Sequence, residues 1–343
     1  MKIGSVNQPS ILFFTPYYEQ NRGNATTAKR IVKGLKDWGI TVWVFAYEEQ
    51  EWNEKWEDHF LRADLYHILH LKRFAEWFTH LPHLVINKPY ILTSGGTDVN
   101  EDLKDPEAAK LMNAVADKSC GITVFSNDGK RKIIEANDKL QDRIFVIPQS
   151  VELPKSEVET DELDGFPTFL LPAGLRPVKD IFYLWDELQS LQNIWPDLAF
   201  YLVGPALDDS LYKDVLMKEK QHKWFHYLKE IPIEEMVGIY EKADYVLNTS
   251  ISEGQSAAVL EAMSLGKMVF ARNNAGNASV IEDFKTGVLF ENPAEFTHKL
   301  VKIVKSIEKR NDICQHAARY VREHHSLEKE MEQYLEVYTH CLS

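Results

Sequence analysis

Two glutamates, Glu253 and Glu261, lie in one short stretch of the chain whose residue types suit the binding of an anionic ligand. The apolar run over 245–247 predicts a strand, and Ser256 is typical of a helix N-cap. A helix start offers an anion unpaired N–H groups and the positive end of a dipole. Glu261 follows Ala257 by four residues on the same helix face, where it could grip hydroxyl groups beside a phosphate.

Small residues in this turn favour close approach of a ligand. Gly254, Ala257 and Ala258 leave space beside the backbone, so a phosphate group fits the predicted helix start. The alternative interpretation is an ordinary strand–helix junction with a solvated glutamate at each end, because helix N-termini commonly carry acids.

A second stretch, AGLRPVKD, ends one predicted strand and opens a helix, with Pro177 suited to the first turn. It carries two cations, Arg176 and Lys179, three residues apart. Placed opposite the turn at Glu253, the two cations would neutralise a diphosphate without a metal ion. The alternative is a solvated basic helix start.

Two loops in the first half of the chain are candidates for the other side of such a site. Gly23 and Asn24 begin a predicted helix after the first strand and could present backbone N–H groups to a ligand. The loop SGGTD contains Gly95, Thr97 and Asp98. Its acid could orient an acceptor hydroxyl, although a turn-forming aspartate after two glycines is an equally good interpretation.

These stretches need a scaffold that brings them together. Short apolar runs alternate with helical patterns along both halves of the chain, which predicts α/β domains with parallel sheets wrapped by helices. The predicted strands are 11–14, 41–46, 63–71, 89–93, 121–125 and 143–147, then 168–172, 198–203, 224–228, 245–247, 268–271 and 287–290. Ligands bind at the carboxyl ends of strands in such folds, where the candidate loops lie.

Chain length favours two domains. A stretch rich in proline and acids separates them, so we expect a first domain over 1–150, a linker over 151–166 and a second domain over 167–326. The last segment, 327–343, has helical periodicity and is expected to pack back on the first domain.

The composition narrows the function classes. A net charge of -13 argues against general nucleic-acid binding. The three cysteines, Cys120, Cys314 and Cys341, have no metal-like spacing, which predicts free thiols in a reducing compartment, most simply the cytoplasm. The sequence also contains no apolar run of signal-peptide or membrane-spanning length.

Several other site types lack their signatures. There is no GxGxxG and no Walker-type loop, which argues against a nicotinamide-dependent dehydrogenase. The histidine pairs, such as His67 with His70, lack further ligands, so no metal site is predicted. Lysines over 29–36 and aromatic residues over 74–84 would suit an anionic membrane or a phosphorylated acceptor, but a solvated face and core packing are the stronger interpretation.

The blocks AGLRPVKD, LVGP around Gly204, and SEGQSAAVLEAM with its two glutamates resemble the donor site of family-4 retaining glycosyltransferases with the GT-B fold. The blocks RGNATTAKR, KPYILTSGGTDVNED and VIPQS look most like the glycosyltransferase 1 domain-containing protein subgroup. The resemblance implies two doubly wound Rossmann-like domains that face each other across a cleft.

The resemblance also implies roles for single residues. Arg176 and Lys179 would hold the donor diphosphate, Glu261 the ribose, and Glu253 the transferred sugar. Backbone groups of Gln255, Ser256 and Ala257 would complete the phosphate cradle. Many relatives have a histidine after the strand that ends at Thr93, where this chain has Gly95.

The expected function is therefore transfer of a sugar, with retention, from a nucleotide-diphosphate sugar to an acceptor that is a small molecule, a glycan or a lipid-linked compound. The nucleotide sugar is a co-substrate, and no cofactor or metal is expected. The alternative is a sugar-nucleotide-binding sensor or scaffold that does not transfer the sugar.

Overall fold

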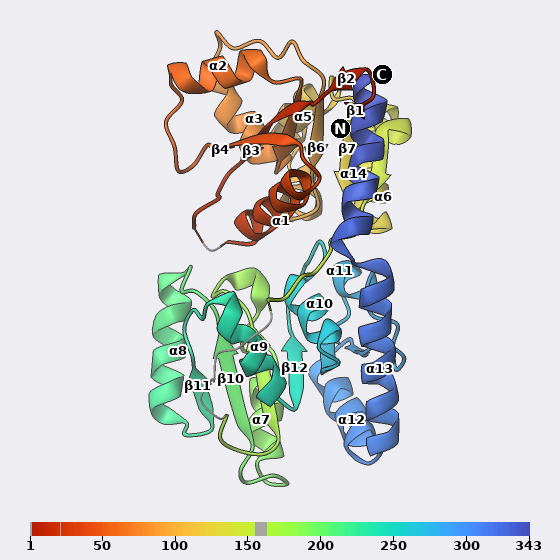
Figure 1. Ribbon diagram of the computed structural model, residues 1–343. Coiled ribbons are helices and arrows are strands. Elements are labelled where there is room, and N and C mark those ends of the chain that lie inside the picture. Colours follow the sequence, from red (N-terminus) through yellow and green to blue (C-terminus); the bar gives the residue numbers. More distant parts are fainter. Residues whose placement is uncertain (1, 21, 155–162) are drawn as a thin grey trace. The chain divides into compact units, whose positions relative to one another are not determined.

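The computed structural model describes residues 2–20, 22–154 and 163–343. The chain divides into two compact units (Figure 1). The first contains the residues up to Gln149 together with Leu327–Ser343, and the second contains Ser150–Ser326. Of the expected linker 151–166, residues 155–162 lie outside the described part of the chain. The residues on either side of that gap bond within the second unit, where Val151 N donates to His325 O and Phe166 N to Asp197 O.

The first unit is built on a six-stranded parallel sheet with the order β4-β3-β5-β6-β7-β8. Its strands are β3 (Ser10–Thr15), β4 (Thr41–Ala46), β5 (Leu65–Leu69), β6 (Tyr90–Thr93), β7 (Gly121–Val124) and β8 (Ile144–Val146). Its helices are α1 (Gly23–Asp37), α2 (Glu54–Arg62), α3 (Leu71–Thr79), α4 (Thr97–Asn100), α5 (Pro106–Ala116), α6 (Asn127–Ala136) and α14 (Leu327–Leu342). A short hairpin of β1 (Lys2–Ile3) and β2 (Val6–Asn7) precedes the sheet.

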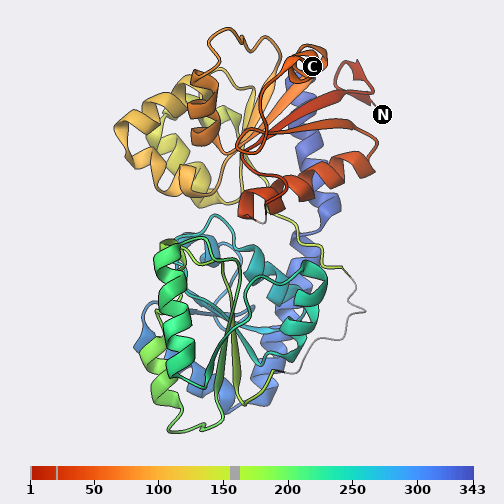
Figure 2. The same cartoon turned by 90° about the vertical axis from the view of Figure 1, so that its left-hand side faces the viewer.

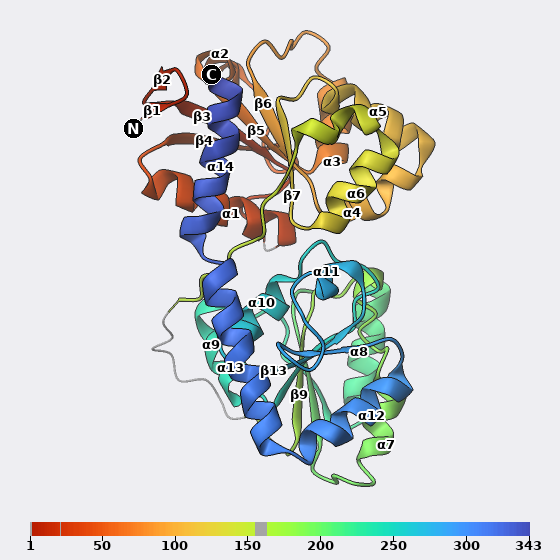
Figure 3. The ribbon, with the colours of Figure 1, turned by 90° about the vertical axis from the view of Figure 1, so that its right-hand side faces the viewer.

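Helices cover both faces of this sheet. Apolar residues of α2, α3, α5 and α6 form one core with alternate residues of the strands. The residues between them on the same strands pack against α1 and α14 on the other face. Figure 3 shows α14 lying along that face. Phe74 and Trp77 of α3 pack with Phe14 and Phe45, and Phe78 stacks on Phe74. These aromatic residues therefore pack on the core rather than forming an exposed stripe.

Polar groups as well as apolar ones attach α14 to the sheet. His67 of β5 is fully buried, with Nδ1 2.6 Å from the hydroxyl of Tyr338 and Nε2 2.6 Å from Oγ1 of Thr93. Burial lowers the pKa of His67 to about 3, so the ring is neutral at physiological pH. Arg30 of α1 forms a largely buried ion pair with Glu330, at 2.9 Å between Nε and Oε2.

The expectation of free thiols is wrong for two of the three cysteines. Cys120 and Cys341 form a disulfide, although 221 residues separate them in sequence. Cys341 lies in α14 and Cys120 directly precedes β7, and the packing of α14 brings their Cα atoms to 5.6 Å. Spacing along the chain could not reveal a pair made by this contact. Cys314 is free.

The second unit repeats the architecture with the strand order β11-β10-β9-β12-β13-β14, again all parallel. Figure 2 shows this sheet between helices on both sides. Its strands are β9 (Thr168–Pro172), β10 (Ala199–Val203), β11 (Phe225–Tyr227), β12 (Tyr245–Asn248), β13 (Met268–Arg272) and β14 (Val288–Phe290). Its helices are α7 (Trp185–Leu191), α8 (Asp209–Gln221), α9 (Ile233–Lys242), α10 (Ala257–Ser264), α11 (Ala275–Ala278), α12 (Pro293–Val304) and α13 (Ile307–His324).

Both faces of the second sheet are also covered, which makes each unit a doubly wound, Rossmann-like α/β domain. Helices α7, α8 and α12 pack on one face, and α9 and α10 on the other. Helix α13 contributes to the cores on both faces of this sheet. Ile313 packs with α7, α8 and α12, and Ala317 and Val321 pack with α9 and α10. The strand order changes direction at β9 and β12, which is where open sheets of this kind bind ligands. In the described part of the chain, no helix is long and apolar enough to cross a membrane.

Candidate functional site

The two predicted donor-site loops meet at one edge of the second sheet. Strands β9 and β12 are neighbours and run parallel, so the loops that follow Pro172 and Asn248 emerge on the same side. There the Nζ atom of Lys179 lies 2.5 Å from Oε1 of Glu253. Two residues that the sequence placed in separate loops therefore form one ion pair.

The backbones of these loops are also joined. The Thr249 hydroxyl donates to the carbonyl of Lys179 at 2.9 Å, and the amide of Ile251 donates to the carbonyl of Val178 at 2.9 Å. Arg272, at the end of β13, holds the next residue of the loop through an ion pair with Asp180 at 2.8 Å. The position of Lys179 is thus set by backbone bonds and by a neighbouring cation.

Glu253 is surrounded by hydrogen-bond donors. Its Oε1 atom accepts from the Ser250 hydroxyl at 2.7 Å and from Nδ2 of Asn248 at 3.3 Å, in addition to Lys179. Burial alone raises the pKa of Glu253, but the Lys179 charge and these donors outweigh burial and hold the pKa below its ordinary value. Glu253 is therefore ionised at neutral pH.

Asn248 connects Glu253 to the start of the helix. Its Nδ2 atom also donates to the Ser256 hydroxyl at 3.0 Å, and its Oδ1 accepts from Nδ2 of Asn277 at 2.9 Å. Asn277 comes from α11 and is fully buried. Hydrogen bonds to Ser256 at the start of α10 and to Asn277 of α11 thus fix the Asn248 side chain at the end of β12.

Helix α10 begins where the sequence predicts. It starts at Ala257, and Ser256 is the N-cap whose side chain accepts from the amide of Val259. Gly254 and Gln255 form the turn before it, and Gln255 is largely buried. The backbone amides of this first turn lie immediately after Glu253 in the chain, so the ion pair and the helix start belong to one site.

Glu261, one turn into α10, has different surroundings. The Tyr240 hydroxyl donates to its Oε2 atom at 2.8 Å. Burial raises the pKa of Glu261, and the hydrogen bond from Tyr240 only partly opposes that rise. The structure therefore holds two glutamates in one loop–helix segment whose pKa values shift in opposite directions.

Gly204 and Arg176 lie on loops at the same edge of the sheet. Gly204 follows β10 with φ of +150°, and a Cβ atom there would come within 2.3 Å of the Ala173 carbonyl oxygen. Only glycine allows the loops after β9 and β10 to approach so closely. Arg176 precedes the 3-10 turn η3 (Pro177–Lys179) and is exposed, and it does not share in the ion pair of Lys179.

The candidate residues of the first unit also follow strands. Gly23 and Asn24 are the first residues of α1, and Thr97 is the first residue of α4. Gly95 follows β6 directly beside Phe125, whose ring a Cβ atom at this position would meet at 2.6 Å. The structure thus places these residues after β3 and β6, the strands that the sequence assigned to them.

Asp98 serves its own loop. Its buried carboxylate accepts from the amides of Leu71, Gly96 and Val99 at 3.0 to 3.1 Å and from the Ser94 hydroxyl. These bonds fit the interpretation of Asp98 as a residue that shapes the turn. They also connect the loop after β6 to the start of α3.

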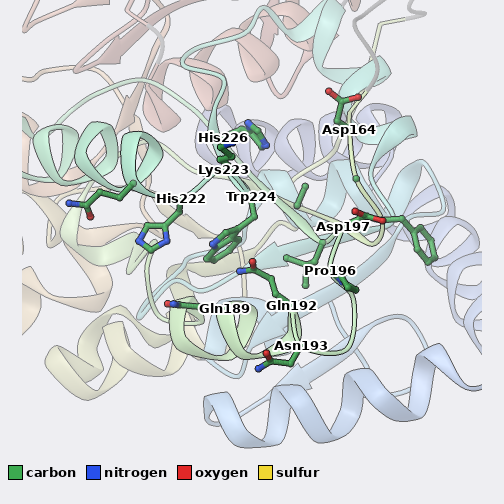
Figure 4. Close-up of a pocket in the computed structure, with 15 residues that line it drawn as sticks. Asp164, Gln189, Gln192, Asn193, Pro196, Asp197, His222, Lys223, Trp224 and His226 are labelled. Atoms are coloured by element: carbon green, nitrogen blue, oxygen red, sulfur yellow. The ribbon is translucent and has the colours of Figure 1, made fainter.

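A groove of about 910 Å³ lies elsewhere in the second unit (Figure 4). It is lined by the segments before β9 and β10, by the end of α7, and by residues next to β11 such as His222 and Trp224. Lys223 is the one lysine or arginine among the lining residues. The groove is therefore at the opposite edge of the sheet from the Lys179–Glu253 pair and lacks the paired cations that a diphosphate needs.

In the part of the chain that the structure describes, no group of three or more His, Cys, Asp or Glu residues is arranged to hold a metal ion. The polar chemistry at the edge of β9 and β12 comes from one lysine, two arginines, one aspartate, two glutamates and neutral donors. Such a set can neutralise a phosphorylated ligand and bind hydroxyl groups.

Sequence reasoning missed several residues of this site. Tyr240 lies on the apolar face of α9, so its periodicity indicates only a core position. Arg272 and Asn277 follow a different strand, and nothing in their spacing connects them to Glu253. Asn248 and Ser250 flank the predicted end of β12, and polar residues at that point were the signal that could have identified them.

Comparisons with known proteins identify relatives of this chain. Residues 154–321 match the family model described as glycosyl transferases group 1. The chain is 30% identical over 258 residues to glycosyltransferase 1 domain-containing protein 1 of Xenopus tropicalis, covering 72% of this chain and 74% of that protein. It is 24% identical over 287 residues to a D-inositol 3-phosphate glycosyltransferase of Corynebacterium urealyticum, covering 76% of this chain and 65% of that one.

Solved structures show the same fold. Anabaena Alr3699/HepE, crystallised with UDP-glucose, superposes with a TM-score of 0.78 at 16% identity over 95% of this chain and 98% of that one. Sucrose-phosphate synthase from Thermosynechococcus elongatus superposes with a TM-score of 0.75 at 14% identity over 96% and 98%. These likenesses place the two Rossmann-like units in the GT-B fold class, and the sequence matches show that the chain belongs to the group 1 glycosyl transferase family.

Proposed function

We propose that this protein transfers a sugar, with retention of the anomeric configuration, from a nucleotide-diphosphate sugar to an acceptor. The observation that carries the proposal is the Lys179–Glu253 ion pair, which adjoins the first turn of α10 at the carboxyl edge of β9 and β12. This edge combines a cation, the N–H groups of a helix start and two partly buried carboxylates, a combination that suits a sugar diphosphate.

The leaving group explains the need for cations. When the bond to the sugar breaks, negative charge accumulates on the diphosphate, and Lys179, Arg176 and the helix start stabilise it. Lys179 is already held by Glu253 and by the backbone of its loop, so little reorganisation is needed when the charge develops. Arg176 is exposed and can turn toward an incoming phosphate.

The two glutamates have separate roles in this proposal. Glu261 accepts hydrogen bonds from the ribose hydroxyls, and Glu253, ionised next to Lys179, contacts the transferred sugar. Backbone groups of Gly254, Gln255, Ser256 and Ala257 complete the phosphate cradle, with Gly204 allowing close approach of the neighbouring loop.

The mechanism follows the resemblance to family 4 of the retaining enzymes. The leaving phosphate accepts the proton of the acceptor hydroxyl on the same face of the sugar, so no separate base is assigned, and no metal or further cofactor takes part. The relatives named as glycosyltransferases and the UDP-glucose complex of the Anabaena protein support a nucleotide-sugar donor.

The acceptor belongs to the first unit in this proposal. The loops that carry Gly23, Asn24, Gly95 and Thr97 follow parallel strands, where open sheets bind ligands. A small molecule, a glycan or a lipid-linked compound would fit this role.

The test is release of nucleoside diphosphate from UDP-, ADP- and GDP-sugars, with and without a panel of acceptors. Replacing both Arg176 and Lys179 by alanine should reduce release at least a hundredfold, since loss of one such donor typically costs about 3 kcal/mol. The matched control replaces Lys213 and Lys220, two exposed lysines of α8, and should keep the wild-type rate. Binding of nucleotide sugars with no release for any acceptor would contradict transfer and favour a sensor.

A further inference from the structure

Tyr240 is a buried tyrosine whose hydroxyl reaches the site from a different helix. Its side chain is 0% exposed, and α9 packs beside α10 on one face of the second sheet. The hydroxyl lies 2.8 Å from Oε2 of Glu261 and 3.5 Å from the carbonyl oxygen of Ala258. Because a hydroxyl donates a single proton, the shorter contact, to a carboxylate, takes it.

Tyr240 is the one group in the described residues that hydrogen-bonds the Glu261 carboxylate, and no cation faces that carboxylate there. A buried carboxylate normally accepts several hydrogen bonds, so the Tyr240 bond accounts for only part of what this group can accept. The pKa of Tyr240 is raised well above its ordinary value by burial, so the hydroxyl stays protonated and remains a donor.

We propose that Tyr240 is a positioning residue for nucleotide recognition: it holds Oε2 of Glu261 so that Oε1 accepts from the ribose hydroxyls of the donor. The inference rests on the proposed function, because it assigns the ribose to Glu261. Tyr240 itself does not touch the nucleotide. Its effect is to fix the rotamer of Glu261 and to favour the ionised carboxylate, which accepts hydrogen bonds without donating one.

This role separates recognition of the ribose from recognition of the phosphates. In the proposed function the phosphates bind at Lys179, Arg176 and the N–H groups at the start of α10, whereas the Tyr240 hydroxyl donates to Glu261. Loss of the Tyr240 hydroxyl should therefore weaken the preference for ribose over deoxyribose while leaving the phosphate contribution in place. A purely structural tyrosine would instead change folding stability and leave that preference intact.

The experiment measures binding of UDP, ADP and GDP and of their 2′-deoxy and 3′-deoxy counterparts by titration calorimetry. For the nucleotide that binds, the wild-type protein should prefer the ribose form by about tenfold or more, as expected for a hydrogen bond to a charged group. In Tyr240→Phe this preference should fall severalfold, and in Glu261→Ala it should disappear. Tyr201→Phe is the control, since Tyr201 donates to the Asp164 carbonyl in the same unit.

A pH series gives a readout that packing alone would not move. The Tyr240 bond lowers the pKa of Glu261, so its removal raises that pKa further. The ribose preference, which needs the ionised carboxylate, should then disappear at a higher pH in Tyr240→Phe than in the wild type as the pH falls. Ratios of ribose to deoxyribose affinity cancel the titration of the nucleotide phosphate, and Glu261→Gln should show no such pH dependence.

The outcomes distinguish the two levels of the proposal. If Glu261→Ala removes the ribose preference and Tyr240→Phe keeps both the preference and its pH dependence, the positioning role is wrong and the proposed function stands. If Glu261→Ala keeps the preference, Glu261 does not bind ribose and the inference fails. If none of the three nucleotides binds the wild-type protein, the proposed function fails and the inference fails with it.

Discussion

The surroundings of Glu253 and of Glu261 differ, although eight positions separate the two residues. Glu253 has a cation and two neutral donors at its Oε1 atom, whereas Glu261 has one tyrosine hydroxyl at Oε2. Both are partly buried, yet the pKa of Glu253 is lowered and that of Glu261 is raised. The folded protein therefore stabilises the Glu253 carboxylate with a cation and hydrogen bonds, whereas the Glu261 carboxylate has fewer hydrogen bonds than it can accept.

This difference indicates what each residue contributes. A satisfied carboxylate stabilises the loop that contains it, and Glu253 connects the loops after β9 and β12 even without a ligand. An incompletely satisfied carboxylate costs stability in the free protein, and a ligand that supplies hydroxyl donors recovers that cost on binding. Glu261 is thus the better candidate for a residue kept for binding alone.

Removing Lys179 tests this difference between the two glutamates most strongly. In Lys179→Met, Glu253 keeps its burial and loses its charge partner, so the free energy of unfolding should fall by about 3 kcal/mol. Release of nucleoside diphosphate should fall about a hundredfold. Chemical denaturation and the release assay measure the two effects.

The matched control for that change is Lys285→Met. Lys285 also pairs with a glutamate, Glu282, but both side chains are more than half exposed. Its loss should change stability by less than about 0.5 kcal/mol. Adding Glu253→Gln to Lys179→Met should recover part of the lost stability, because no buried charge then remains; a further loss would contradict this account.

A smaller effect separates the glutamates directly. At pH 7, Glu253→Gln should lower the free energy of unfolding by about 1 to 2 kcal/mol, since it gives up hydrogen bonds to an ionised group. Glu261→Gln should be neutral or stabilising, because glutamine still offers an oxygen to Tyr240 and carries no buried charge. Denaturation in urea measures both variants. Equal losses of unfolding free energy would show that the two glutamates do not differ in their contribution to stability.

The smallest effect is in the pH dependence of stability. The pKa of Glu253 is lower in the folded than in the unfolded protein, so its contribution is present above the unfolded value and is lost as pH falls through the folded value. The pKa of Glu261 is raised, so its contribution is present below the unfolded value and is lost as pH rises through the folded value. Unfolding of each Gln variant across pH 3 to 8, compared with the wild type, should show opposite slopes.

Most of the sheet architecture could be predicted from the sequence. Each strand of the two six-stranded sheets overlaps a predicted apolar run, because a strand buried on both faces needs consecutive apolar residues. The hairpin of β1 and β2 was not predicted, since each strand is only two residues long. Helix α2 (Glu54–Arg62) was not predicted either, since Trp56 and Phe60 are its only buried residues.

The candidate site was predictable only where local sequence patterns mark the ends of strands and the starts of helices. The cap at Ser256 and the placement of Lys179 near Glu253 followed from local patterns and from the rule that parallel strands share an edge. Tyr240, Arg272 and Asn277 reach the site through tertiary packing, which leaves no spacing to detect. The Cys120–Cys341 disulfide escaped prediction for the same reason.

The return of α14 to the first unit has a consequence for the order in which the protein folds during synthesis. The second unit is continuous in sequence, so its core can close as soon as its last helix is available. The first unit begins earlier, yet Met331, Tyr334 and Tyr338 of its core belong to the final helix. The unit whose synthesis begins first can therefore complete its core only after the whole second unit has been made.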